Sequence, residues 1–254
     1  MPLMPGAEPF QHEGGPVGVL LCHGFTGSPQ SLRPWGDHLA ADGFSVACPR
    51  LPGHGTRWQD MNDTRWPDWY AEVDRALAAL RARCDEVFLG GLSMGGTLAI
   101  RLAEQHGAAV AGLILVNPSL GTDRWDVKLL PVLSRVLASR PGVANDIKKP
   151  RSREVAYDRL PLKATLSLQQ FWATTRADLA RVDQPILLFR SSEDHVVEPL
   201  SGRLLLEGVR SDDVEEHVLG DSYHVATLDN DAPAIFAGST AWIRARSRRT
   251  ADRP

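Results

Sequence analysis

The sequence predicts an α/β protein whose central sheet is mostly parallel and is covered by helices on both faces. Short runs rich in Val, Ile and Leu alternate along the chain with longer stretches of helical periodicity. Continuous apolar strands of this kind are typical of a sheet buried on both sides. The 254 residues are 43% hydrophobic and 23% charged, an ordinary globular composition with enough length for one large core.

The elements follow in chain order from these runs. We expect strands at Val17–Cys22, Ser45–Pro49, Val87–Gly90, Gly112–Asn117, Ile186–Arg190 and Val214–Leu219. An apolar stripe over residues 69–84 predicts a helix before the third strand, and an Ala- and Leu-rich helix is expected over residues 93–104, directly after it. Asp231 is expected to cap a last helix, whose apolar face lies within residues 235–243.

The alternation is interrupted once, between Ser119 and Ala180, where we expect no strand. A stretch of about 60 residues is too long for an ordinary connection. Two helices are expected in it, one from apolar positions at helical spacing and one over Leu160–Leu179; the spaced positions are Leu129, Val132, Leu133, Val136 and Leu137. The insert follows the carboxyl end of a strand, the edge at which open α/β sheets bind ligands, which favours a lid over extra scaffold. We therefore predict a core of residues 1–118 and 181–246, a helical cap at 119–180 and a flexible tail at 247–254.

Charge and cysteine content exclude several classes of protein. Twenty-eight Lys and Arg against 31 Asp and Glu give a net charge of −3, so no basic face and no nucleic-acid partner are expected. The basic run at 244–249 is interpreted as a solvated tail. Three cysteines without a CxxC pair predict neither a zinc site nor a disulfide framework. Without a basic leader or a long apolar run, we expect a cytoplasmic protein with no membrane span.

The strongest local signal is the segment VFLGGLSMGG, residues 87–96. A strand enters the pattern G-x-S-x-G and a helix leaves it, which is the context of a nucleophile elbow. Glycines at 91 and 95 allow the tight turn, and Ser93 lies at a helix N-terminus that favours negative charge. Ser93 is therefore the predicted nucleophile.

A serine hydroxyl needs a base and an orienting acid. In a fold with this elbow they are expected in the chain order serine, acid, histidine, each just after a strand. Asp194 follows the strand that ends at Arg190, and His224 follows the strand that ends at Leu219. Glu193 remains the alternative acid. Asp221 is interpreted as a turn residue; the other nearby histidines are interpreted as structural or loop residues, namely His54, His195 and His217, with His195 a candidate for the pocket rim.

An oxyanion hole requires two backbone N–H donors near the reacting carbonyl. Met94, directly after the nucleophile, is the first candidate. Phe25, in the His23-Gly24-Phe25 turn after the first strand, is the second, because that turn projects at the same sheet edge as Ser93.

Several motifs together resemble one protein family. They are HGFTGSPQSLRPW, LPGHGT, GGLSMGG, SSEDHVV and SYHVATLD. They look like the small bacterial monoacylglycerol lipases and carboxylesterases of the α/β-hydrolase superfamily. The resemblance implies the α/β-hydrolase fold with a helical cap, the triad Ser93, Asp194 and His224, and oxyanion donors Phe25 and Met94, without metal or cofactor. Sixteen residues precede Val17, so the two N-terminal strands of larger relatives are expected to be shortened or absent.

The cap predicts the substrate class. It is rich in apolar side chains, about half of which we expect to pack the cap and half to line an acyl channel: Trp125, Leu129, Leu130, Leu133, Leu137, Phe171 and Trp172. No Arg cluster suits an anionic head group, so a neutral ester is favoured. Glu154 is a candidate for binding polyol hydroxyls, or else an exposed helix residue, and Asn117 is a candidate for the pocket edge or for satisfying a loop.

The predicted reaction is hydrolysis of monoacylglycerols to fatty acid and glycerol through an acyl-enzyme. The alternatives on the same triad are a short- or medium-chain carboxylesterase, a thioesterase and an acyltransferase. A non-catalytic ligand receptor is disfavoured by the intact triad. Transient contact of the cap with a lipid surface is also expected, whereas the sequence does not indicate the oligomeric state.

Overall fold

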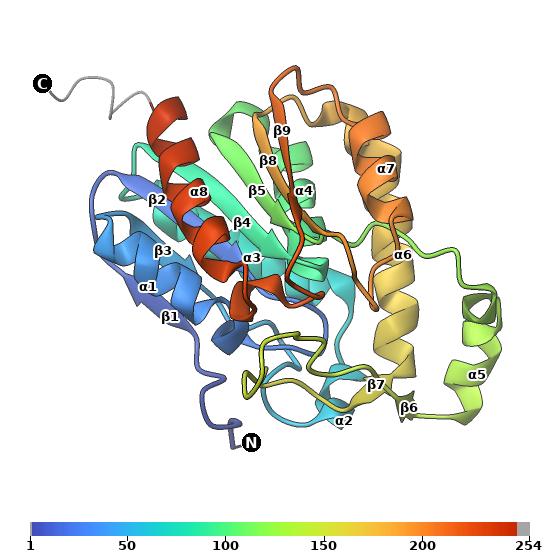
Figure 1. The fold of residues 1–254 in the computed structure, drawn as a ribbon. Coiled ribbons are helices and arrows are strands. Elements are labelled where there is room, and N and C mark those ends of the chain that lie inside the picture. Colours follow the sequence, from blue (N-terminus) through green and yellow to red (C-terminus); the bar gives the residue numbers. More distant parts are fainter. Residues whose placement is uncertain (1, 248–254) are drawn as a thin grey trace, which may run out of the picture.

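The computed structural model describes residues 2–247, apart from the side chains of Asp126 and Lys128. Within that range a seven-stranded sheet forms the centre of the molecule (Figure 1). In spatial order its strands are β1 (Phe10–His12), β3 (Ser45–Cys48), β2 (Val17–Cys22), β4 (Glu86–Leu92), β5 (Gly112–Val116), β8 (Ile186–Ser191) and β9 (Val214–Leu219). Within this seven-stranded sheet of the described residues, only β1 is antiparallel to its neighbour. The predicted, mostly parallel α/β sheet is confirmed.

Helices cover both faces of the sheet (Figure 1). On one face lie α1 (Arg33–Ala41) and α8 (Ala232–Arg246), and on the other lie α3 (Trp66–Arg81), α4 (Met94–His106), α6 (Leu162–Asp178) and α7 (Leu200–Gly208). The short connecting helices are η1 (Pro29–Leu32), α2 (Trp58–Met61), η2 (Gly107–Ala109), η4 (Leu179–Arg181) and η5 (Ala226–Leu228). The stripe predicted for α3 packs into the core, where Trp69, Val73 and Leu77 are fully buried. No helix among residues 2–247 is long and apolar enough to span a membrane.

Two expectations at the ends of the chain hold only in part: the strand before Val17 is shortened, as expected, and Asp231 stands at the N-cap position of α8. The first strand is β1 rather than Val17–Cys22, and it consists of three residues paired with β3. Its sequence FQH is too short for an alternating pattern, so only the pairing with β3 defines it. Asp231 precedes α8, but its side chain makes no capping bond and instead accepts from the Asp221 N–H at 2.8 Å. The predicted tail beyond Ser247 lies outside the described residues.

The insert between β5 and β8 differs from the prediction in two respects. It contains a small antiparallel pair, β6 (Ser139–Pro141) and β7 (Arg159–Pro161), where no strand was expected. Each strand has three residues and a proline, so neither shows a strand signal. The predicted helix is present as η3 (Trp125–Leu129) and α5 (Leu130–Val136), but its apolar stripe faces outward: Val132 is 65% exposed and Val136 is 75% exposed.

Candidate active site

Ser93 occupies a strained turn between β4 and α4. Its backbone angles, φ 57° and ψ −121°, lie in a region that residues with a side chain rarely adopt. The flanking glycines are required by contact distances. A Cβ atom on Gly91 would lie 2.3 Å from the Gly95 carbonyl oxygen, and one on Gly95 would lie 1.8 Å from that of Cys22. The elbow predicted from the sequence is therefore formed as a tight turn that presents the serine at the carboxyl edge of the sheet.

His224 and Asp194 meet at the same edge. His224 lies in the loop after β9, residues 220–230 (the base loop), and Asp194 lies in the loop after β8, residues 192–199 (the acid loop). Their side chains are 7% and 8% exposed, and His224 Nδ1 lies 2.8 Å from Asp194 Oδ2. The other Asp194 oxygen accepts the N–H groups of Val196 and Val197, each at 2.8 Å. These bonds fix the carboxylate toward the imidazole.

The surroundings of this pair shift both pKa values in the direction of an ion pair. Burial acts to lower the pKa of His224, but the carboxylates of Asp194, Glu154 and Asp146 outweigh it and the net shift is upward. Burial acts to raise the pKa of Asp194, but His224 and the two backbone donors outweigh it and the net shift is downward. An imidazolium formed at His224 is therefore stabilised where it stands.

The alternative residues lie elsewhere. Glu193 is 56% exposed and its side chain lies 3.4 Å from His195, so of these two neighbours Asp194 contacts the His224 imidazole. Asp221 pairs with Lys148 at 3.0 Å. His217 pairs with the exposed Glu215 on β9, and His54 is buried behind the site.

The Gly24–Phe25 turn lies beside the elbow. A Cβ atom on Gly24 would lie 3.5 Å from Ser93 Cβ. Among the described groups, no hydrogen-bond acceptor is recorded for the backbone N–H of Phe25 or of Met94. Both are thus available as donors. His23 holds the turn: its Nδ1 lies 3.0 Å from the Gly24 carbonyl and its Nε2 accepts from the Leu51 N–H at 3.1 Å. Burial lowers the pKa of His23 to about 4, so the neutral ring serves this role.

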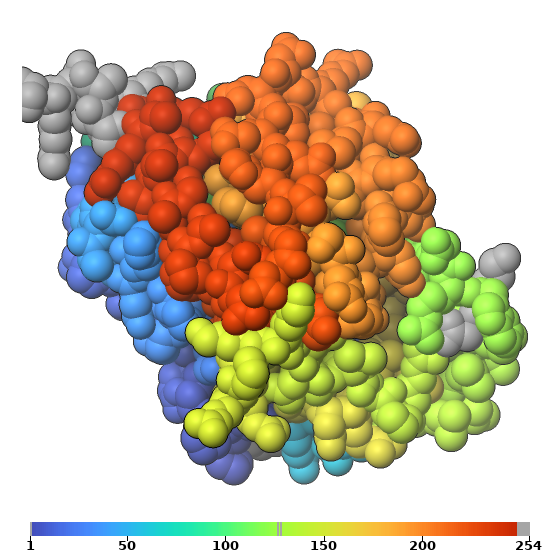
Figure 2. All heavy atoms as spheres, viewed as in Figure 1, coloured from blue at the N-terminus to red at the C-terminus, as the bar shows by residue number. Residues whose placement is uncertain are grey.

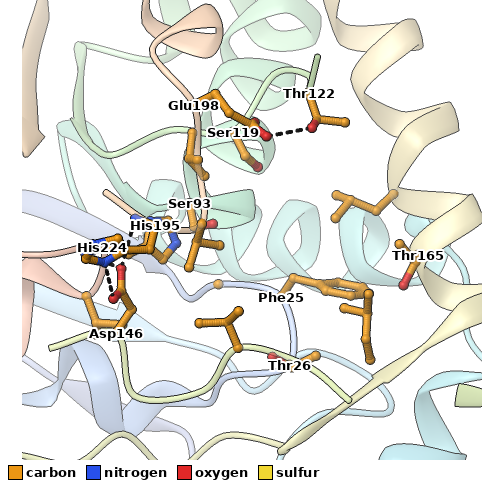
Figure 3. Close-up of a pocket in the computed structure, with 18 of the residues that line it drawn as sticks. Phe25, Thr26, Ser93, Ser119, Thr122, Asp146, Thr165, His195, Glu198 and His224 are labelled. Atoms are coloured by element: carbon orange, nitrogen blue, oxygen red, sulfur yellow. Dashed lines mark hydrogen bonds and ion pairs between the residues drawn. The ribbon is translucent and has the colours of Figure 1, made fainter. Parts of the chain in front are cut away.

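These groups face one pocket of about 370 Å³ (Figure 3). In Figure 3, Ser93, His224, His195 and Asp146 lie in the left part of the view, and Phe25 and Thr26 lie below and to the right of Ser93. No hydrogen bond joins the Ser93 hydroxyl to His224 in the described structure, although both side chains line the pocket. Much of the remaining wall comes from the insert and is apolar, including Val127, Val143, Leu160, Leu168 and Trp172.

Glu154 and Asn117, the two predicted substrate-binding residues, differ in placement. Glu154 lies in an irregular segment of the insert, lines the pocket, and makes no side-chain hydrogen bond to another described residue. Burial raises its pKa to about 7, against the opposing effect of His224. Asn117 lies outside this pocket, so the expectation that it forms the pocket edge is wrong. Its amide is used internally, by Ser191 at 2.9 Å and by the His224 carbonyl at 2.8 Å.

The apolar cap residues named from the sequence also divide unequally. Of the seven apolar cap residues predicted from the sequence, Trp172 is the one among the residues that line this pocket in the described structure. Phe171 instead stacks on Trp66, with 5.1 Å between ring centroids, and is fully buried. Leu129 and Leu137 are half exposed. The expectation that half of the set lines a channel is therefore wrong, because α5 turns its stripe away from the pocket.

Sequence reasoning missed Asp146. Its carboxylate contacts His195 Nδ1 at 2.8 Å and the N–H groups of His195 and His224 at 3.2 Å each. The surrounding sequence, ANDIKKP, carries no motif, and no pattern in the chain could have placed it here.

A parallel sheet with a serine elbow after a central strand, and with acid and base after two later strands, is the arrangement of α/β-hydrolases. The chain belongs to one family of them, described as serine aminopeptidase, S33, whose model matches residues 17–231. It is a hydrolase.

Relatives of known name support the predicted branch of this family. The chain is 43% identical over 243 residues to the thermostable monoacylglycerol lipase of Bacillus sp. (strain H-257), with 94% of each chain covered. It is 24% identical to the carboxylesterase of Bacillus subtilis (strain 168), over 90% of this chain and 92% of that one. A solved structure from work on the metagenome-derived lipolytic enzymes LipS and LipT matches with a TM-score of 0.93 and 41% identity, covering 96% of this chain and 100% of the other. The resemblance to bacterial monoacylglycerol lipases and esterases is confirmed.

Proposed function

We propose that this chain, a carboxylic ester hydrolase, cleaves monoacylglycerols to fatty acid and glycerol. The observation that carries the proposal is the buried His224–Asp194 pair at 2.8 Å, facing the same pocket as the strained Ser93. A bacterial monoacylglycerol lipase that is 43% identical over 94% of the chain supports the choice of ester.

In this proposal Ser93 Oγ attacks the ester carbonyl while His224 Nε2 accepts its proton. Asp194 keeps Nδ1 protonated and stabilises the imidazolium, and the N–H groups of Phe25 and Met94 bind the oxyanion. His224 then returns the proton to the departing glycerol oxygen. The same histidine then takes a proton from water, which attacks the acyl-enzyme carbonyl. The proton passes back to Ser93 Oγ as the bond to the acyl group breaks and the fatty acid leaves. No step requires a metal or cofactor.

The pocket favours an apolar chain joined to a small polyol. Its wall combines aliphatic side chains from the insert with one carboxylate that makes no hydrogen bond to another described residue, Glu154. A carboxyl group left without a partner in a buried site is costly unless a ligand binds it. Glycerol hydroxyls are suitable donors.

We expect Glu154→Ala to lose about 1–3 kcal/mol of transition-state binding for monoacylglycerol, the usual value of a hydrogen bond to a charged group. A methyl ester of the same fatty acid has no hydroxyls, so its kcat/KM should change little. The assay is best run at pH 8, because the pKa of about 7 leaves Glu154 mostly ionised there. Equal losses on both esters would assign Glu154 a structural role.

The same assay tests substrate class. A panel of mono-, di- and triacylglycerols and of esters from acetyl to oleoyl should show monoacylglycerol cleaved fastest, since the insert restricts space at the head-group end. Efficient triacylglycerol cleavage would contradict that choice. Comparable rates on thioesters, or acyl transfer to an added alcohol, would favour the thioesterase or acyltransferase reading instead.

Contact with a lipid surface is also part of the proposal. Five large apolar side chains of η3, α5 and their flanks are at least half exposed near the pocket: Trp125, Leu129, Val132, Val136 and Leu137. We expect Val132→Ser/Val136→Ser to lower the rate on vesicle-borne monoacylglycerol several-fold, while kcat/KM on a soluble short-chain ester stays the same. Co-sedimentation with neutral vesicles measures the binding directly. Unchanged sedimentation of the double variant would remove this part of the proposal.

A further inference from the structure

One segment of the insert, residues 145–157, is bonded to the catalytic loops around it; we call it the strap. In Figure 2 the yellow-green atoms of this region lie against the red atoms of the base loop. Asp229 of the base loop accepts four backbone N–H groups, at 2.7 to 2.9 Å, two of them from Lys148 and Lys149 of the strap. Ser152 Oγ donates to the Leu228 carbonyl at 2.8 Å. The strap and the base loop are thus joined at several points.

The strap also reaches the segment after β2 that contains the Gly24–Phe25 turn. The Tyr157 N–H donates to the Thr26 carbonyl at 3.1 Å, and the Val155 N–H donates to the Gln30 side chain at 2.9 Å. Gln30 in turn donates to the Arg153 carbonyl at 3.1 Å.

Asp146 is the point at which the strap meets both the acid loop and the base loop. A single oxygen, Oδ2, accepts the N–H of His195, the neighbour of Asp194, and the N–H of His224 itself. The other oxygen contacts His195 Nδ1, and the Asp146 carbonyl accepts the Val225 N–H at 3.1 Å. The Asp146 side chain is only 9% exposed, so little solvent competes for these bonds.

We infer that Asp146 is a positioning residue that holds His224 and the acid loop at their working separation. The inference rests on the proposed triad. The His224–Asp194 bond joins side chains from two loops, and Asp146 joins the backbones of the same loops one residue from Asp194 and at His224. Displacements of about 1 Å in such a site cost on the order of 100-fold in rate. Asp146 therefore acts on the reaction through His224 and Asp194.

A charge contribution accompanies the geometric one. The carboxylates that face His224 are Asp194 of the acid loop and Glu154 and Asp146 of the strap, and all three favour its protonated form. His195, which contacts Asp146 through Nδ1, lies beside Tyr223, with 4.7 Å between ring centroids. Removing the Asp146 charge lowers the pKa of His224, which must be neutral to act as a base. In a plot of kcat/KM against pH, the rise on the acid side (the acid limb) should therefore move to lower pH.

Two substitutions at Asp146 separate these contributions. Asp146→Asn keeps a carbonyl oxygen for the two backbone donors and presents its NH₂ group to His195, which can accept in its other tautomer; it removes mainly the charge. Asp146→Ala removes the bonds as well. On a soluble short-chain ester we expect Asp146→Ala to lose about 10- to 100-fold in kcat with KM within about twofold. Asp146→Asn should lose less, and both should shift the acid limb downward.

Asp229→Asn is the matched control. Asp229 joins the same strap to the same base loop but makes no hydrogen bond to the acid loop in the described part of the chain, and it is not among the charges that shift the pKa of His224. This variant should lower Tm and leave the acid limb where it is. A kcat of Asp146→Ala within twofold of the unmodified enzyme would overturn the inference. The inference would also be overturned if Asp146→Ala lost kcat while its acid limb stayed in place and its Tm fell as much as that of Asp229→Asn.

Failure of the proposed triad and failure of the Asp146 role give different results. Failure of the unmodified enzyme to hydrolyse esters, or hydrolysis that survives Ser93→Ala, would contradict the proposed function itself. Ester hydrolysis that depends on Ser93 but is indifferent to Asp146 contradicts only the positioning role. His195→Gln adds a further check: the ring of His195 is 49% exposed, so it should be replaceable with a small change in kcat, whereas a loss matching that of His224→Gln would make His195 and Asp146 the working pair.

Discussion

Ser93→Ala is expected to lower kcat by about 10⁵- to 10⁶-fold on any soluble ester, because members of a catalytic triad act as a unit. The Ser93 hydroxyl makes no hydrogen bond to another described group, and alanine bears the same Cβ at φ 57°. The fold should therefore be unaffected, with Tm within a few degrees. Steady-state kinetics and a thermal melt on the same preparation check both expectations.

Ser119→Ala is the control for this prediction. Ser119 lines the same pocket and its hydroxyl accepts from Trp172 Nε1 at 3.1 Å, so its loss should change kcat by less than tenfold. A fluorophosphonate probe should label Ser93 in the unmodified enzyme. Labelling of another serine, or substantial activity in Ser93→Ala, would show that the nucleophile is elsewhere.

Asp194→Asn is expected to lower kcat by about 10⁴-fold, since an amide presents the wrong partner to His224 Nδ1 and stabilises the wrong tautomer. The amide would also lose the ion pair that raises the pKa of His224. Glu193→Gln removes the adjacent carboxylate, which is exposed and faces His195, and should change kcat less than threefold. Kinetics of the two variants side by side measure the difference, and the reverse ranking would assign the acid to Glu193.

The parts of the fold that carry regular patterns could be predicted from the sequence. Five of the six predicted core strands read as short apolar runs because they are buried on both faces, whereas β9 (VEEHVL) is a largely exposed edge strand. The structure ends all six within two residues of the prediction. The elbow could be predicted because its glycines are dictated by contact with Cys22 and with each other. The meeting of Asp194 and His224 could be predicted because parallel strands bring their carboxyl ends to one edge.

Other features depend on tertiary contacts that leave no local pattern. The strands β6 and β7 are defined only by their pairing across about 20 positions of the chain. Neither three-residue segment is an apolar run that could be recognised by itself. The outward face of α5 could not be predicted, since helical periodicity identifies a stripe without saying what it packs against. Asn117 and Asp146 are single polar residues whose roles are set by partners 74 and 78 positions away.

The strap limits how parts of this enzyme can be exchanged between relatives. A chimera cut at residues 119 and 180 would transfer the outward-facing helix α5 together with the strap. The transferred strap would then have to form its hydrogen bonds with three loops of the recipient. Graft boundaries placed before Asn145 would instead move η3, α5 and β6 alone, and would leave Asp146, Glu154 and Tyr157 with the loops that they contact. The unit that can be exchanged without disturbing the catalytic scaffold is therefore smaller than the inserted segment.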